Sequence, residues 1–331
     1  LIDPPLGSGA MRAAQVTSLD GPGSVTVREV PEPDAGQVVI DVEYAGVTFP
    51  DVLLTRGEYQ IKPPPPFIPG SEVSGVVRSA PEGALVTAGD RVAAFPGLGG
   101  FAEVVAADPR MVFALPAEMS LESAAGLPMN YLTVDFALVR RGRLQSGETV
   151  LVQGAAGGVG TAAIQMAKAL GARVIAVVSD DGKATVARRA GADETVPADG
   201  FRAAVADLTD GRGVDLVVDP VGGDRFTDSL RSLAPEGRLL VIGFTAGEIP
   251  TVKVNRLLLN NISVVGVGWG AFWLARPDYL QEQWSRVLPM LRDGALEPVI
   301  GAVYPLEDVG QALTALDSRS ATGKVLLKVR G

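Results

Sequence analysis

The feature that most constrains the fold is a regular alternation of short apolar runs and helical patterns from residue 149 onward. The apolar runs are rich in β-branched residues and of strand length, and amphipathic helical patterns separate them. Strands fit residues 149–152, 173–178, 194–196, 214–218, 238–243 and 262–267, and helices fit 159–170, 183–190, 201–208 and 224–233. Repeated strand–helix units predict an α/β domain with a parallel sheet covered on both faces.

The first strand of this series runs into a glycine-rich turn, VLVQGAAGGVG at residues 150–160. Its spacing is that of a dinucleotide-binding fingerprint with alanine in the first place, which requires an ordinary φ at that alanine. The helix amides after the turn point at an anion, and the glycines allow close approach of a pyrophosphate and of the helix. The alternative is a tight turn without a ligand. The predicted cofactor loop comprises Ala155, Gly157, Gly158, Val159 and Gly160.

The end of the second strand bears on the choice of cofactor. An NAD site usually has an acid there to hold the ribose hydroxyls. Here the strand ends at Ser179 and is followed by Lys183, whose ammonium suits a 2′-phosphate, although it could also be an exposed helix charge. Asp180 and Asp181 either cap the next helix or turn inward and favour NAD. The sequence therefore favours NADPH over NADH.

The N-terminal part has a different sequence pattern, without the alternation of strands and helices. Short β-branched runs at residues 25–27, 38–42, 73–77, 91–95 and 102–105 are punctuated by glycine and proline, which predicts a small barrel. Helices are expected at 120–126, 130–140 and 277–292, and a β-like ending at 302–304 and 325–329 should return to the barrel. The predicted division is a catalytic barrel domain at 11–128 and 270–331, and a nucleotide domain at 129–269. Residues 1–10 are expected to be a cloning leader or a flexible terminus before Met11.

The composition excludes several kinds of chemistry. The 331 residues include no cysteine and no histidine, so disulfides, a thiolate nucleophile, a Cys/His zinc site and a histidine acid or base are all excluded. The net charge of −9 argues against nucleic acid and anionic membranes as partners. No apolar run is long enough for a membrane span, and residues 1–10 do not look like a signal peptide. We expect a cytoplasmic enzyme acting on a small molecule.

Taken together, the motifs resemble the zinc-free quinone oxidoreductases of the medium-chain dehydrogenase/reductase superfamily. They are LVQGAAGGVGTAAIQMAKALGA, PGSEVSGVV (69–77), GDRVAAF (89–95), AAGLPMNYLTVDFAL (124–138), VDLVVDPVGG (214–223), GRLLVIGF (237–244) and SRSATGKVLLK (318–328). The resemblance implies a GroES-like barrel with an inserted Rossmann domain, cofactor and substrate in the cleft between them, and a homodimer. Zinc-dependent relatives carry a histidine where Ser71 stands, and a cysteine near residues 46–48.

The same resemblance implies further cofactor-binding residues. Thr133 matches a threonine near the nicotinamide, and Gly243 and Phe244 should lie beside that ring. Gly268 and Trp269 are expected to form the opposite wall of the nicotinamide site. Lys183 is expected to contact the 2′-phosphate, and Arg319 to lie near the cofactor phosphates.

The sequence also departs from the family pattern at the predicted site. Thr48 stands where many relatives have asparagine, Leu53 where some have a tyrosine beside the substrate, and Ala198 where some have a tyrosine beside the adenosine. We therefore expect a cleft of different shape, which leaves the substrate open.

The predicted reaction is hydride transfer from C4 of NADPH to a quinone or a small α,β-unsaturated carbonyl, without zinc. A quinone needs little acid help, whereas an enone or enoyl thioester needs a donor to its oxyanion. Tyr59 is the first candidate for this donor, and the alternative is that it only packs the barrel rim. Asp51 is expected either to order its loop or to cap a helix. The other candidate donors are Thr48, Ser71 and Thr133. The alternatives are an enoyl-thioester (acyl-CoA) reductase and a non-enzymatic NADPH-binding protein.

Overall fold

The computed structural model describes residues 9–34 and 36–330, which fall into two compact units. The first unit extends to Met129 and adds Pro277–Trp284 and the segment from Ile300. The second comprises Asn130–Arg276 and Ser285–Val299. Residues 270–276 and 285–299, which the sequence-based division placed with the barrel, thus pack with the second unit. Eight of the ten residues of the expected leader, 1–8, lie outside the described part of the chain.

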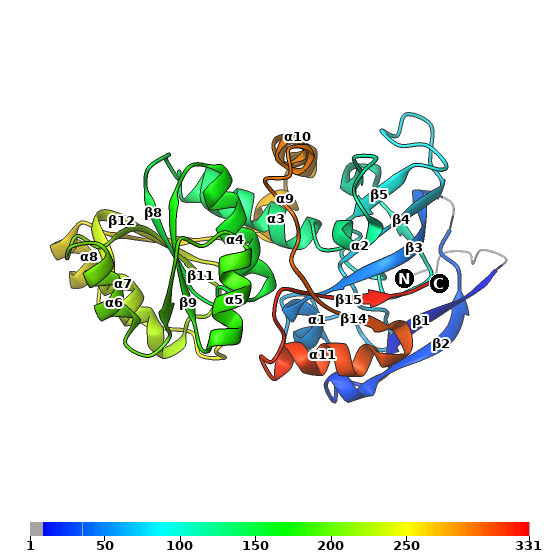
Figure 1. The fold of residues 1–331 in the computed structure, drawn as a ribbon. Coiled ribbons are helices and arrows are strands. Elements are labelled where there is room, and N and C mark those ends of the chain that lie inside the picture. Colours follow the sequence, from blue (N-terminus) through cyan, green and yellow to red (C-terminus); the bar gives the residue numbers. More distant parts are fainter. Residues whose placement is uncertain (1–8, 35, 331) are drawn as a thin grey trace. The chain divides into compact units, whose positions relative to one another are not determined.

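The first unit is built on a mostly antiparallel sheet to which both ends of the chain contribute. Its order is β14-β15-β3-β4-β5-β7, and β6 pairs with β3. Strands β1 and β2 form a separate pair (Figure 1). Valine and alanine side chains fill its core. The strands are β1 (Ala10–Val16), β2 (Val25–Pro31), β3 (Val38–Val47), β4 (Glu72–Ser79), β5 (Arg91–Ala94), β6 (Val104–Ala107), β7 (Val112–Ala114), β14 (Ile300–Pro305) and β15 (Lys324–Lys328), and the helices are α1 (Phe49–Leu54), α2 (Leu121–Ala124) and α11 (Val309–Asp317).

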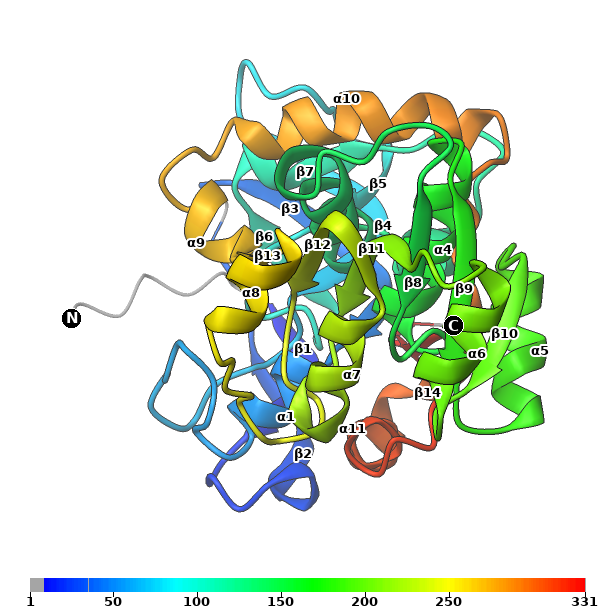
Figure 2. The same ribbon diagram turned by 90° about the vertical axis from the view of Figure 1, so that its left-hand side faces the viewer.

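The second unit has a six-stranded parallel sheet in the order β10-β9-β8-β11-β12-β13, as Figure 2 shows from right to left. Helices cover both faces, with α4 and α5 on one side and α6, α7 and α8 on the other (Figure 1). The strands are β8 (Thr149–Val152), β9 (Arg173–Val178), β10 (Glu194–Pro197), β11 (Val214–Asp219), β12 (Leu233–Val241) and β13 (Ser263–Gly266). The helices are α4 (Gly158–Ala169), α5 (Asp181–Arg189), α6 (Phe201–Leu208), α7 (Phe226–Arg231), α8 (Asn255–Asn260) and α9 (Trp269–Trp273), together with most of α3 (Pro128–Asp135) and the second half of α10 (Tyr279–Arg292), whose first half belongs to the first unit. The predicted α/β class and parallel sheet are confirmed.

The order of this sheet places the nucleotide turn at its centre. The chain enters at β8, moves outward to β10, and returns to the other side of β8 as β11. Ligands of open parallel sheets bind at the carboxyl ends of the strands where the order reverses, which is here between β8 and β11. None of the described helices is both long and apolar enough to cross a membrane.

Two elements differ from the sequence-based expectation. The helix expected at 130–140 is an α-helix that continues as a π-helix over Phe136–Arg141, where the amide of Gly142 donates to the carbonyl of Ala137 at 2.7 Å. Helical periodicity in the sequence does not distinguish these two forms. Helix α11 lies between the two segments expected to be β, 302–304 and 325–329, where no element was expected, and it buries Val309, Ala312 and Leu313 on one face.

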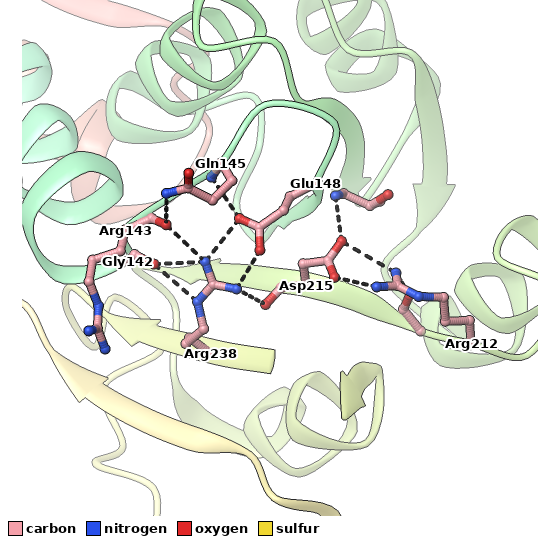
Figure 3. A network of polar contacts seen from close by, with 9 residues as sticks. Gly142, Arg143, Gln145, Glu148, Arg212, Asp215 and Arg238 are labelled. Atoms are coloured by element: carbon pink, nitrogen blue, oxygen red, sulfur yellow. Dashed lines mark hydrogen bonds and ion pairs between the residues drawn. The ribbon is translucent and has the colours of Figure 1, made fainter. Parts of the chain in front are cut away.

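The amino edge of the parallel sheet is held by a network of charged groups (Figure 3). Arg238 on β12 donates to both carboxylate oxygens of Glu148, at 2.7 and 2.9 Å, and to the carbonyl of Gly142 at 2.8 Å. Asp215 on β11 accepts from the amide of Thr149, the first residue of β8, at 2.8 Å. These bonds join β8, β11, β12 and the end of the π-helix, and so fix where β8 begins.

We expect Arg238→Ala to lower the free energy of unfolding by about 2–4 kcal/mol, because it leaves a largely buried carboxylate and a carbonyl without their donor. The side chains of Arg238 and Glu148 are only 18% and 20% exposed. Arg212→Ala is the control, since Arg212 pairs with Asp215 but is 59% exposed, and it should cost less than about 1 kcal/mol. Denaturant unfolding measures both, and equal losses would contradict the role given to Arg238.

Candidate active site

The nucleotide turn explains the alanine in the first place of the fingerprint. Gly154 takes the left-handed conformation, with φ of 58°, and Ala155 is not among the described residues with positive φ. Ala155 is fully buried, and its amide donates to the carbonyl of Val177 on β9 at 3.3 Å. The conformation that needs glycine thus falls one residue before the alanine, as the sequence analysis required.

The other glycines of the turn have separate roles. A Cβ on Gly160 would lie 2.3 Å from the carbonyl oxygen of Gly154, so only glycine lets α4 pack this closely. A Cβ on Gly157 would have its nearest neighbour at 3.5 Å, which leaves the backbone open on that side. Gly157 is the N-cap of α4, no side chain caps the helix, and its first turn holds no acid. The first amides of α4 are therefore available to an anion.

A hydroxyl and an ammonium group meet at the end of β9. The Nζ of Lys183 lies 3.0 Å from the Oγ of Ser179, which in turn donates to Asp180 at 2.9 Å. Asp180 is the N-cap of α5 and accepts from the amide of Lys183 at 2.9 Å, and this bond chiefly lowers the pKa of its carboxyl. Of the two roles considered for Asp180, the structure shows the helix cap.

The turns after β11 and β12 reach the same edge of the sheet. The carboxylate of Asp219 accepts from the amides of Val221 and Gly222, both at 2.9 Å, and burial raises its pKa. A Cβ on Gly154 would lie 3.0 Å from Val221, so this turn abuts the nucleotide loop. Thr245 donates to the carbonyl of Pro220 at 3.1 Å, which holds the segment with the predicted residues Gly243 and Phe244 beside it.

The remaining predicted cofactor residues lie in parts of the chain other than the nucleotide turn. Thr133 lies on α3, is 8% exposed, and forms no side-chain hydrogen bond with a described residue. Gly268 is the N-cap of α9, and Trp269 is buried with its ring 5.9 Å from that of Trp273. Arg319 belongs to the first unit, where it is exposed and has φ of 57°. Their roles toward a cofactor stay predictions.

The first unit carries a second buried polar cluster, centred on Asp51. Its carboxylate accepts from the amide of Thr48 at 2.8 Å, the hydroxyl of Thr48 at 2.6 Å and the amide of Gly70 at 3.0 Å. Asp51 therefore both closes a capping box at the start of α1 and fixes the loop at Gly70. Burial raises the pKa of Asp51 to about 6, against the effect of these hydrogen bonds.

The three candidate hydroxyl donors of this unit are in different states. The hydroxyl hydrogen of Thr48 is donated to Asp51 and is not available while that carboxylate is ionised. The Oγ of Ser71 is buried and has no hydrogen-bond partner among the described residues. Tyr59 is half-buried, no described residue bonds its hydroxyl, and burial together with the charge of Asp51 raises its pKa. Tyr59 and Ser71 are the free donors.

Comparisons with known proteins agree with this architecture. Residues 34–117 match the alcohol dehydrogenase GroES-like domain family, and residues 158–293 match the zinc-binding dehydrogenase family. The chain is 42% identical over 325 residues to quinone oxidoreductase-like protein 2 of Rattus norvegicus, covering 96% of this chain and 92% of that protein. It is 30% identical over 335 residues to the quinone oxidoreductase of Homo sapiens, covering 97% and 98%.

Solved structures show the same fold over the whole length. A probable oxidoreductase from Mycobacterium abscessus superposes with a TM-score of 0.90 and 47% identity, covering 98% of this chain and 100% of that one. The quinone oxidoreductase of Thermus thermophilus, also solved in complex with NADPH, gives 0.83 and 37%, covering 96% and 100%. The chain belongs to the quinone oxidoreductase-like proteins of the medium-chain dehydrogenase/reductase superfamily. It is an NAD(P)-dependent oxidoreductase.

The zinc in the name of the matched family does not fit the residues of this chain. The sequence has no cysteine or histidine, and a Cβ on Gly46 would lie 2.6 Å from the carbonyl oxygen of Ala125 and 2.6 Å from Glu72. Glu72, fully buried, pairs with the ammonium of Lys324 through one oxygen and accepts from the amide of Met129 at 2.7 Å through the other. Both oxygens of this buried carboxylate are thus engaged by groups of the chain itself.

The raised pKa of Asp51 predicts a distinct dependence of stability on pH. Because the folded state holds this proton more tightly than an unfolded chain, with a pKa of about 6 against about 3.9, the contribution is present below pH ~4 and lost as the pH rises through 6. The loss amounts to roughly 3 kcal/mol. We expect the free energy of unfolding of the wild type, relative to Asp51→Asn, to fall by this amount between about pH 4 and 7.5.

Denaturant unfolding across this pH range measures the difference. Asp20→Asn, the same change at an exposed residue, is the control and should leave the wild-type profile unchanged. Parallel pH profiles for the wild type and Asp51→Asn would show that Asp51 does not titrate in this range.

Proposed function

We propose that the protein transfers a hydride from NADPH to a quinone or a small α,β-unsaturated carbonyl, without zinc. The observation that carries the proposal is the open amino terminus of α4 beside the hydroxyl and ammonium groups at the end of β9. NADPH, when bound, supplies the hydride at its nicotinamide C4. The protein binds and orients the reactants and provides hydrogen-bond donors.

The preference for NADPH rests on Ser179 and Lys183. The ammonium of Lys183 can donate to a 2′-phosphate, and such a charge-assisted bond is among the stronger hydrogen bonds. The hydroxyl of Ser179 can donate to the same phosphate once it turns away from Asp180. Asp180, the acid nearest to them, caps α5 through one oxygen and accepts from the hydroxyl of Ser179 through the other, so both of its oxygens have partners within the protein. The NADPH complex of the Thermus thermophilus relative supports the same choice.

The hydroxyls of Tyr59 and Ser71 are proposed to donate to the substrate oxygen. A reduced quinone is a stable anion and needs little help, whereas an enone requires such donors in the transition state. Thr48, whose hydrogen is committed to Asp51, acts through its oxygen as an acceptor and holds the loop that carries the site. Thr133 is proposed to lie near the nicotinamide, as the resemblance implies.

The test is the oxidation of NADPH at 340 nm by the purified protein with 1,4-benzoquinone, 9,10-phenanthrenequinone, a simple enone and crotonyl-CoA, with NADH in parallel. We expect turnover of quinones with NADPH. Lys183→Ala should raise the KM for NADPH at least about tenfold and leave that for NADH unchanged, because it removes a charge-assisted bond to the 2′-phosphate.

Lys168→Ala is the matched control, since Lys168 is a lysine of α4 that pairs with Asp193 on the surface. Turnover of crotonyl-CoA alone would instead support an enoyl-thioester reductase. Binding of NADPH without any turnover would support a non-enzymatic role.

We also propose a homodimer formed through β13. This strand ends the described sheet, contains no charged residue or proline that would block pairing, and so presents a free edge. Beside it, Val254, Leu258 and Leu259 are 73%, 76% and 74% exposed. A second copy of the same chain would extend the sheet and cover these side chains.

Light scattering after gel filtration is expected to give twice the chain mass. Leu258→Glu should shift the protein toward monomer, because a carboxylate in an apolar interface is costly. Leu85→Glu, a change at a side chain that is 74% exposed in the first unit, should leave the dimer intact. A wild-type monomer would refute this assembly.

A further inference from the structure

Asn130 is a buried amide that the protein itself does not satisfy. It lies in the first turn of α3, is only 6% exposed, and its side chain forms no hydrogen bond with any described residue. Thr133, one helical turn later and therefore on the same face, is 8% exposed and in the same state. Neither polar group is among the fully enclosed side-chain atoms that lack a partner, so both keep a small opening to the outside through which a ligand can reach them.

The amide of Asn130 lies against the start of α4. A Cβ built on Gly158 would be 2.6 Å from its Nδ2, 3.4 Å from its Cγ and 3.6 Å from its Oδ1. The end of the side chain is therefore the part closest to Gly158, the first residue of α4. Any side chain at 158 would displace this amide, which gives Gly158 a role that the fingerprint spacing alone does not explain.

The amino terminus of α4 and the side chain of Asn130 both present hydrogen-bond donors. The first turn of α4 presents backbone N–H donors, with no side chain to cap them and no acid among its residues. The amide of Asn130 adds a side-chain donor at the same place. An anionic oxygen is the acceptor that satisfies both at once, and the pyrophosphate of a dinucleotide is such a group.

We propose that Asn130 is a cofactor-binding residue whose Nδ2 donates to a phosphate oxygen at the amino terminus of α4, in the space that Gly158 leaves for it. This inference rests on the proposed function, and it deepens that function by naming a contact to the pyrophosphate. The alternative is that Asn130 only packs α3 against α4.

The test measures the Kd of NADPH by fluorescence titration for the wild type, Asn130→Asp and Asn130→Ala. Asn130→Asp keeps the shape of the side chain and replaces the donor with a carboxylate, which repels the negative phosphate, so it should raise the Kd by at least about tenfold. Asn130→Ala only removes the donor and should raise the Kd about fivefold. Asn255→Asp, the same change at an exposed position on α8, should leave the Kd within about twofold of the wild type.

A second ligand, 2′-AMP, distinguishes the loss of a pyrophosphate contact from a general disruption of the nucleotide site. 2′-AMP carries the phosphate expected at Lys183 but no pyrophosphate, so Asn130→Asp should bind it like the wild type. A Kd for NADPH that is unchanged in Asn130→Asp, with a wild type that binds, overturns this inference alone. A wild type that binds neither NADPH nor NADH overturns the proposed function and the inference with it. Equal losses for NADPH and 2′-AMP overturn the assignment to the pyrophosphate.

The contact between Gly158 and Asn130 predicts non-additivity. Gly158→Ala should weaken NADPH binding at least about fivefold in the wild type, because its Cβ displaces the amide. In an Asn130→Ala background the Cβ has room and no donor remains to be displaced, so Gly158→Ala should then add less than about twofold. Additive effects would show that the two residues act independently and would overturn the proposed pairing.

Discussion

The close packing of α4 on the turn that precedes it is the contact on which the rest of the nucleotide domain depends. No Cβ fits between Gly160 and the backbone of Gly154 and Ala155, so the helix begins directly above the end of β8. This proximity places the free amides of α4 at the point where the strand order reverses. At the opposite edge, Arg238 and Glu148 fix the start of β8, so the turn is carried by a strand held at both ends.

The barrel unit organises its polar residues around buried carboxylates. Asp51 holds three donors and thereby fixes the loops at Thr48 and Gly70, while Glu72 is divided between Lys324 and the amide of Met129. Carboxylates placed in this way are costly unless every oxygen is satisfied, and here each oxygen has a partner. Their hydrogen bonds decide which hydroxyls remain free, and so favour Tyr59 and Ser71 over Thr48 as donors to a substrate.

The sequence predicted the elements whose signal is local. The β-branched runs at β8 and β9 and the glycine spacing of the turn are properties of a few consecutive residues, and the structure has them at the expected positions. Asp180 and Asp51 show the limit of this reasoning, because the sequence offered two roles for each. The contact with Lys183 shows the helix cap for Asp180, and the contacts with Thr48 and Gly70 show that Asp51 fills both of its roles.

Other features depended on contacts that no local pattern contains. The role proposed for Asn130 depends on its contact with Gly158. The ion pair of Glu72 joins it to Lys324, which is 252 residues away in the sequence. The π-helical turn at Phe136–Arg141 has the same apolar periodicity as an α-helix. Helix α11, in contrast, did carry a signal in the spacing of Val309, Ala312 and Leu313, and the β-like residues around it obscured this signal.

The central claim is that the amino terminus of α4 binds the phosphates of a dinucleotide, and hydrogen–deuterium exchange tests it most directly. The first amides of α4 have no intrahelical acceptor and should exchange rapidly in the free protein. The account predicts that saturating NADPH slows exchange in peptides spanning residues 157–161 and 179–183, and leaves α11 unchanged. Exchange at 157–161 that is the same with and without bound NADPH would contradict it.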